Sequence, residues 1–238
     1  MSQGVPYSAG QQDLFYPAKF LDSFPTQRPK TDAELCAWMA LLAYCDLYPN
    51  FAFDQDKIKQ KLGPLGFKPL GFFESKGHET NGGTHRFVAL HDNAVKENKL
   101  VVAFRGTDKD DPSDVMDDVD AELVPRKGTA KDYDGWKDAL AEVETDLFPV
   151  VQPIDYKLLF TGHSLGAALA TLLASVKVPS ALYMIGSPRV GDHDFVASLN
   201  GVESFRYVDC CDIVTQLPPA LLGSRISASR TTSTATAT

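Results

Sequence analysis

The stretch whose residues could do chemistry most directly is a Gly-x-Ser-x-Gly motif, Gly162-His163-Ser164-Leu165-Gly166. An apolar run at 157–161 precedes it, and a run rich in alanine and leucine follows at 167–174. The order of strand, motif and helix is what a tight turn needs to expose a serine hydroxyl above the edge of a sheet. The pattern predicts that Ser164 is a nucleophile, with the N-terminus of the next helix beneath a developing oxyanion.

The bulk composition limits the function classes. The chain has 238 residues, of which 44% are hydrophobic and 23% charged, as expected for one soluble α/β domain with a substantial core. A net charge of -8 disfavours nucleic acid and anionic membrane surfaces as partners. No apolar run could span a bilayer, and residues 1–17 lack the features of a signal peptide. We therefore expect a cytoplasmic protein without an integral membrane segment, with non-classical export as the alternative. The oligomeric state is left open.

The cysteines favour neither a metal nor a disulfide framework. They are Cys36, Cys45, Cys210 and Cys211, and none shows the paired spacing of a zinc site. Cys36 and Cys45 lie nine residues apart on one expected helix, too far to bridge within it. The sequence therefore predicts four reduced thiols, with no metal.

Strands and helices are expected to alternate along the chain. Residues 1–30 predict an extended arm or a partly disordered segment, and 31–223 the folded domain. Helices are expected at 31–47, 54–62, 133–148 and 164–176, and strands at 71–75, 84–91, 100–104, 157–161, 181–185 and 204–208. This order predicts an α/β fold with a mostly parallel sheet and helices on both faces.

Four motifs together resemble the class 3 (fungal-type) lipases of the α/β-hydrolase superfamily. They are Val-Val-Ala-Phe-Arg-Gly-Thr at 101–107, the serine motif at 162–166, Gly-Ser-Pro-Arg-Val-Gly at 186–191 and Asp-Ile-Val-Thr-Gln-Leu-Pro-Pro at 212–219. The resemblance covers residues 35–223. It implies the α/β-hydrolase fold and a serine carboxylic-ester hydrolase of the triacylglycerol lipase or esterase type. The implied partner is an ester or acylglycerol substrate, and no cofactor is implied.

The resemblance also implies roles for individual residues. Ser164 is the nucleophile, Asp212 the acid of the triad, and the backbone N–H groups of Thr107 and Leu165 form the oxyanion hole. Asp212 fits the chain order Ser, Asp, His, although a turn aspartate that caps the next segment is the alternative. The alternative for Thr107 is an ordinary residue where a strand meets a loop. His163 is expected to pack and orient rather than act as a base, because adjacent side chains diverge.

Two segments depart from the family pattern. Residues 108–124 stand in the place of the family's lid, yet their first part, 108–120, carries many aspartates and only three apolar side chains, Val115, Met116 and Val119. We expect a solvated acidic loop rather than a lid that docks on lipid, and calcium binding is disfavoured because no EF-hand spacing is present. Tyr-Asp-Gly-Trp at 133–136 replaces the family's His-x-Gly-Phe.

The third departure concerns the catalytic base. The family's histidine follows Leu-Pro-Pro, but no histidine follows Pro219 here. Residues 224–238 are rich in serine, threonine and alanine, which predicts a disordered tail. One permitted back-translation, read two bases later, encodes Ala-His-Ile-Gly-Lys-Pro-His-Tyr-Ile-Asp, which is similar to the family's sequence here. We therefore hypothesise that a frameshift truncates a longer hydrolase at its C-terminal end.

The missing base leaves a second function open. The chain could be a catalytically impaired relative, that is, a pseudoenzyme or an acyl-binding module. His193, in a loop after a late strand, is the candidate substitute base. A surface loop histidine is the favoured interpretation, because a triad base must reach both Ser164 and Asp212.

Overall fold

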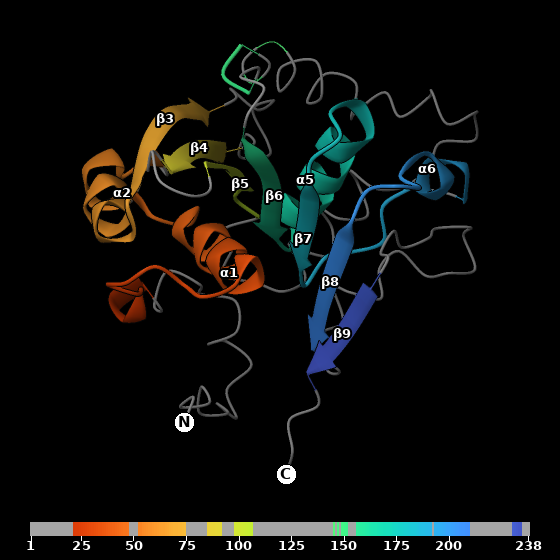
Figure 1. The fold of residues 1–238 in the computed structure, drawn as a ribbon, viewed down its shortest axis with the longest axis horizontal. Coiled ribbons are helices and arrows are strands. Elements are labelled where there is room, and N and C mark those ends of the chain that lie inside the picture. Colours follow the sequence, from red (N-terminus) through yellow and green to blue (C-terminus); the bar gives the residue numbers. More distant parts are fainter. Residues whose placement is uncertain are drawn as a thin grey trace.

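A seven-stranded sheet forms the centre of the protein (Figure 1). The computed structural model describes residues 21–47, 52–74, 85–91, 98–106, 145, 147, 149–151, 156–191, 193–209 and 230–234. The strands are β3 (Phe67–Glu74), β4 (His85–His91), β5 (Lys99–Phe104), β6 (Lys157–His163), β7 (Ala181–Ile185), β8 (Ser204–Asp209) and β9 (Arg230–Thr234), and they neighbour one another in that order. The pairs from β3 to β5 are antiparallel and those from β5 to β9 are parallel.

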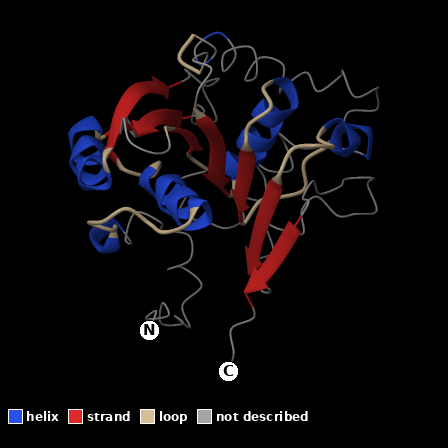
Figure 2. Cartoon of the chain, in the orientation of Figure 1, coloured by secondary structure: helices blue, strands red, loops and turns tan. Residues whose placement is uncertain are grey.

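Helices cover both faces of this sheet (Figure 2). The described helices are α1 (Asp32–Leu42), α2 (Gln55–Leu62), the short 3₁₀ helix η3 (Gly63–Leu65), α5 (Leu165–Val176) and α6 (His193–Ser198). A separate two-stranded ribbon pairs β1 (Asp46–Leu47) with β2 (Ala52–Phe53). Among the described residues, no helix combines the length and apolar character needed to cross a bilayer.

Strand β5 shows how the core is divided. All six of its residues are buried, as its continuous apolar run predicts for a strand covered on both faces. Its side chains alternate: Val101 and Ala103 join the cluster that contains α1 and α2, while Leu100, Val102 and Phe104 join the cluster that contains α5. The sheet is thus a buried layer between two helical layers, and its strand ends are held in fixed positions.

Helix α1 is shorter than the sequence predicts. It begins as expected, with the Thr31 side chain accepting a hydrogen bond from the Glu34 amide. It ends at Leu42 rather than 47, because the next amides bond back into a tight turn and Asp46 then enters β1. Cys45 therefore lies beyond the helix. Cys36 and Cys45 are both buried free thiols.

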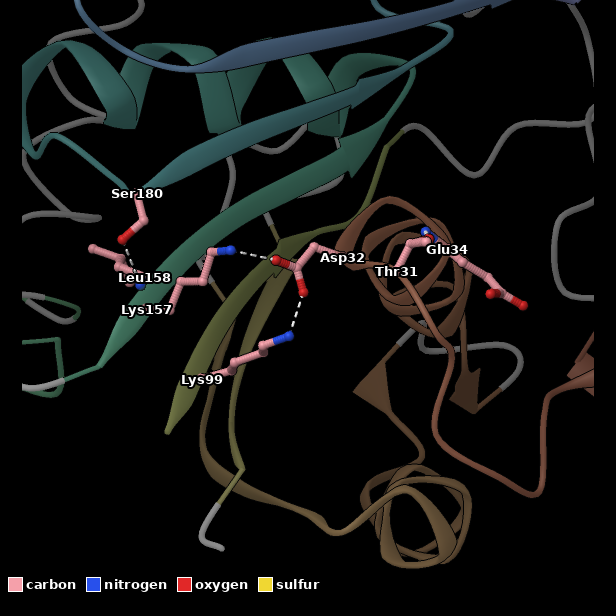
Figure 3. A network of polar contacts seen from close by, with 7 residues as sticks. All are labelled: Thr31, Asp32, Glu34, Lys99, Lys157, Leu158 and Ser180. Carbon is pink, nitrogen blue, oxygen red and sulfur yellow. Dashed lines mark hydrogen bonds and ion pairs between the residues drawn. The ribbon is translucent and has the colours of Figure 1, made fainter. Parts of the chain in front are cut away.

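A partly buried ion cluster fixes α1 to the amino ends of β5 and β6 (Figure 3). Asp32 contacts the ammonium group of Lys99 at 2.5 Å and that of Lys157 at 2.7 Å, and these two lysines are register partners. Burial alone would raise the pKa of Asp32, but the two ammonium groups outweigh burial and hold the pKa below its ordinary value. The cluster lies at the edge of the sheet opposite Ser164, which follows the carboxyl end of β6.

The end of the chain corrects one prediction. Residues 224–238 are expected to be disordered, but Arg230–Thr234 form β9, which pairs in parallel with β8. A strand at the edge of a sheet is held by main-chain hydrogen bonds and does not need an apolar face, and its three threonines are β-branched residues that favour strands. The polar composition therefore does not exclude a strand here. The other residues of this segment lie outside the described ranges.

Part of the expected N-terminal arm belongs to the core. Leu21 and Phe24 are buried, and Phe24 makes an edge-on contact with Trp38 of α1, with ring centroids 5.6 Å apart. Residues 1–20 and 108–124 lie outside the described residues. Of the helix expected at 133–148, only Thr145 and Leu147 are described as helical.

Candidate active site at the carboxyl end of strand β6

Ser164 occupies the sharp turn between β6 and α5. Its φ of 54° and ψ of -129° make it the only non-glycine residue with positive φ in the described part of the chain. An L-amino acid adopts such a conformation only where its surroundings impose it. Here the Ser164 amide donates to the carbonyl oxygen of Ile185 at 2.9 Å, and its own carbonyl accepts from the amide of Ala167 at 2.9 Å. The serine predicted to be the nucleophile thus lies on a strained turn that β7 and α5 hold in place.

The two glycines of the motif are required by close packing. A Cβ atom on Gly162 would lie 2.6 Å from the amide nitrogen of Ala167, and one on Gly166 would lie 2.5 Å from the carbonyl oxygen of Phe104. These contacts are with backbone atoms, which cannot rotate away as a side chain can. The turn can therefore form only if both positions lack a Cβ.

The chain that follows β5 runs directly against the elbow. A Cβ atom on Gly106 would lie 2.5 Å from the carbonyl oxygen of His163 and 3.2 Å from the Cβ of Ser164. The segment 101–107, singled out from the sequence, is therefore next to Ser164 as far as Gly106. Thr107, the next residue, lies outside the described residues.

The two remaining predicted site residues are Leu165 and Asp212, and the structure describes Leu165. Leu165 is the first residue of α5, so its backbone N–H has no acceptor within the helix. Asp212 lies outside the described residues, three positions after β8 ends at Asp209. Because β6 and β8 belong to the parallel part of the sheet, the chain leaves β8 at the edge where Ser164 stands.

His163 contacts Tyr44, a residue that the sequence analysis did not single out. The Tyr44 hydroxyl lies 2.9 Å from Nδ1 of His163, and the two rings meet edge-on with centroids 5.8 Å apart. Burial lowers the pKa of His163 to about 4, so the imidazole is neutral at pH 7. This contact agrees with a packing and orienting role. No motif marks Tyr44, because it lies in the turn that the sequence predicts as the continuation of α1.

We expect His163 to make stability depend on pH. Its pKa of about 4 in the fold is below the ordinary 6.5, so its contribution is present above pH 6.5 and is lost as the pH falls toward 4. At pH 5 the loss should reach at most about 2 kcal/mol. Urea unfolding at pH 7 and pH 5 should show a larger loss in the wild type than in His163→Gln, which cannot titrate. Equal losses in the two proteins would contradict this assignment.

A buried ion pair involves Arg105, the residue between β5 and Gly106. Arg105, which directly follows β5, donates from Nη1 to Oδ2 of Asp46 at 3.0 Å, and the two side chains are 6% and 14% exposed. Asp46 begins β1 and follows Tyr44 by two residues. One short segment after α1 thus contacts both the elbow, through Tyr44, and the chain after β5, through Asp46.

The third sequence motif, at 186–191, forms the turn after β7. Gly186 and Gly191 have φ values of 57° and 77°, which glycine adopts without strain. The carbonyl oxygen of Ser187 accepts a hydrogen bond of 2.7 Å from Nη2 of Arg206, a buried residue of β8. The motif therefore fixes the turn beside the elbow. His193 begins α6, and its side chain is not among those described.

The described surroundings of Ser164 are those that a nucleophilic serine requires, as the sequence predicts. Ser164 stands at the N-terminus of α5, where the helix dipole and unpaired amides favour negative charge. Within the described part of the chain, no group of three histidine, cysteine, aspartate or glutamate side chains is placed to hold a metal ion.

Known proteins share both the sequence and the fold. The family model of lipase (class 3) matches residues 101–222. A lipase of Rhizopus niveus is 32% identical over 207 residues, covering 79% of this chain and 50% of the relative. Phospholipase A1-II 1 of Oryza sativa subsp. indica is 32% identical over 158 residues, covering 50% of this chain and 40% of the relative. The chain thus spans about half the length of the relatives it matches.

The solved structure of lipase II from Rhizopus niveus aligns with 87% of this chain and 78% of its own, with a TM-score of 0.58 at 23% sequence identity. This similarity confirms the predicted α/β-hydrolase fold. The family match covers the strand before Gly106, the elbow at Ser164 and the turn after β7, the three described segments that meet at the site. The chain belongs to the class 3 lipase family.

Proposed function

We propose that the protein is a serine carboxylic-ester hydrolase that works through an acyl-enzyme on Ser164. The observation that carries the proposal is the elbow itself, a serine with φ of 54° between the central strand β6 and the N-terminus of α5. A fold maintains such strain where a nucleophile must be exposed to its substrate. The membership of the chain in the class 3 lipases supports the same reaction.

The proposed reaction has two steps. A general base takes the proton of Ser164, whose oxygen attacks the ester carbonyl, and the alcohol leaves with that proton. The backbone N–H groups of Leu165 and Thr107 stabilise the oxyanion, and Asp212 orients the base. Water then attacks the acyl group, the base takes a proton from the water, and the acid and free serine are regenerated. No metal or cofactor takes part in this scheme.

The proposed substrates are carboxylic esters of the acylglycerol type. Relatives named as lipases and as a phospholipase A1 support glycerolipid esters as the substrate class. Hydrolysis of p-nitrophenyl esters from acetate to palmitate, together with a triacylglycerol and a phosphatidylcholine, tests the proposal and ranks the substrates. Absence of turnover on the whole series would count against it, provided that Ser164 also fails to take up a covalent ester-mimicking probe.

One observation favours a second candidate, a catalytically impaired relative that binds acyl groups. Within the 238 residues of the sequence, the last histidine is His193. The neutral imidazole of His163 is engaged by Tyr44, and its low pKa makes it a weak base. The two candidates differ in one measurable respect, because a serine without its base reacts slowly with covalent probes.

We expect the activity not to rise at a lipid surface. Residues 108–120, in the first part of the segment that stands in the place of the family's lid, carry many carboxylates and few apolar side chains, so we expect no apolar face that docks on lipid. The rate of ester hydrolysis should therefore change less than about twofold when tributyrin passes from monomers to emulsion. A rise of several-fold at that boundary would contradict the expectation.

A further inference from the structure

The chain that follows β5 meets the elbow through closely packed, buried backbone at Gly106 rather than through a side chain. Gly106 lies so close to His163 and Ser164 that no Cβ fits, and the carbonyl of Phe104 touches Gly166. Glycine permits this close approach because it lacks a Cβ atom, but it has no side chain of its own to anchor the segment. A neighbouring side chain must therefore hold this segment in position against Ser164.

Arg105 is the described residue best placed to do so. It precedes Gly106, its side chain is 6% exposed, and its guanidinium group bonds Asp46 at 3.0 Å. Asp46 is fixed in turn, because β1 pairs with β2 and Asp46 is the register partner of Phe53, a buried residue. A charge pair this well buried restrains both partners, because separating them would remove a hydrogen-bonded counter-charge from each buried group.

The opposite end of β5 offers a direct comparison. Lys99, the first residue of the strand, pairs with Asp32 in an equally buried contact. Each end of β5 is thus held by a buried aspartate from the segment 32–46. Both pairs stabilise the fold, but only the Asp46–Arg105 pair adjoins the residues packed against Ser164.

We propose that Asp46, acting through Arg105, is a positioning residue that sets the main chain after β5 against Ser164. This inference rests on the proposed function, because residues 105–106 directly precede Thr107, whose N–H group is proposed to stabilise the oxyanion. Hydrogen-bond donors of this kind act only when they lie within a few tenths of an ångström of the developing charge. Asp46 does not touch substrate in this scheme. Asp46 instead restricts the position of the main chain that is proposed to contact the substrate.

The test compares Asp46→Asn with Asp32→Asn, the matched loss of a buried carboxylate at the other end of β5. Three quantities are measured on the full chain: the midpoint of urea unfolding, amide hydrogen exchange at Arg105 and Gly106 relative to β6, and the rate of fluorophosphonate labelling per folded molecule. We expect both variants to unfold at lower urea. Only Asp46→Asn should speed exchange at residues 105–106, and only Asp46→Asn should slow labelling, by about tenfold or more.

A second pair of variants covers the case in which Asp46→Asn does not fold. Arg105→Lys keeps the cation and should retain more of the labelling rate than Arg105→Gln, which removes it. Equal labelling rates in these two would overturn the proposal, as would equal slowing in Asp32→Asn and Asp46→Asn. If the wild type does not label at all, labelling reports nothing about Ser164 in this form, and the exchange comparison at residues 105–106 alone decides the positioning role.

Discussion

Replacing Ser164 with alanine should abolish covalent labelling of the protein by a fluorophosphonate probe and leave the domain folded. The probe mimics an ester and forms its bond with an activated serine oxygen. Ser164→Ala removes that oxygen and little else, because the Ser164 side chain makes no capping hydrogen bond to α5. Alanine meets the same strain at φ of 54° as serine does, so the free energy of unfolding should change by less than about 1 kcal/mol.

The matched control is Ser175→Ala. Ser175 lies on the same helix α5, and its hydroxyl donates to the carbonyl oxygen of Leu172, away from the elbow. Ser175→Ala should label at the wild-type rate. Labelling that persists in Ser164→Ala would rule out Ser164 as the nucleophile, regardless of the labelling rate of Ser175→Ala.

The second large effect concerns the catalytic base. A form in which the shifted reading frame replaces residues 224–238 and restores a histidine should hydrolyse p-nitrophenyl butyrate several orders of magnitude faster than the 238-residue polypeptide. Loss of a triad member costs about 10⁴- to 10⁶-fold in kcat, while the oxyanion hole alone leaves about 10³- to 10⁴-fold catalysis over water. Because triad losses are not additive, Ser164→Ala should slow the restored form by a similar factor but change the residual rate of the 238-residue polypeptide little.

Two controls make this prediction specific. Replacing the restored histidine by alanine should return the rate to that of the 238-residue polypeptide, and His193→Ala should change neither rate appreciably. Robust turnover by the 238-residue polypeptide that is lost on His193→Ala would contradict the account and make His193 the base. Sequencing of the source DNA past the codon for Gly223 tests the frameshift, which an intact frame encoding only the serine, threonine and alanine tail would disprove.

The sequence predicted those parts of the fold that depend on local pattern. The run at 100–104 predicted a strand buried on both faces, and β5 is one, because five apolar residues in succession leave no face for water. The glycines around Ser164 predicted the elbow, because the approach of α5 to β6 and β5 leaves no room for a Cβ atom. In both cases neighbouring residues alone determine the outcome.

Features that depend on distant partners were not predicted. Tyr44 and Asp46 were assigned to a helix, yet their side chains contact His163 and Arg105, which lie 119 and 59 residues further along the chain. No local pattern encodes such contacts. Strand β9 was missed for a related reason, since its pairing depends on the open edge of β8 rather than on its own polar composition.

The central claim is tested most directly by locating the covalent adduct. The restored-frame form is treated with a fluorophosphonate, digested, and its peptides are sequenced by tandem mass spectrometry. The account predicts a single phosphonylated residue, Ser164, within the peptide that carries Gly-His-Ser-Leu-Gly, and no adduct in Ser164→Ala. An adduct on any other serine, or a restored-frame form that hydrolyses esters with Ser164 unmodified, would contradict it.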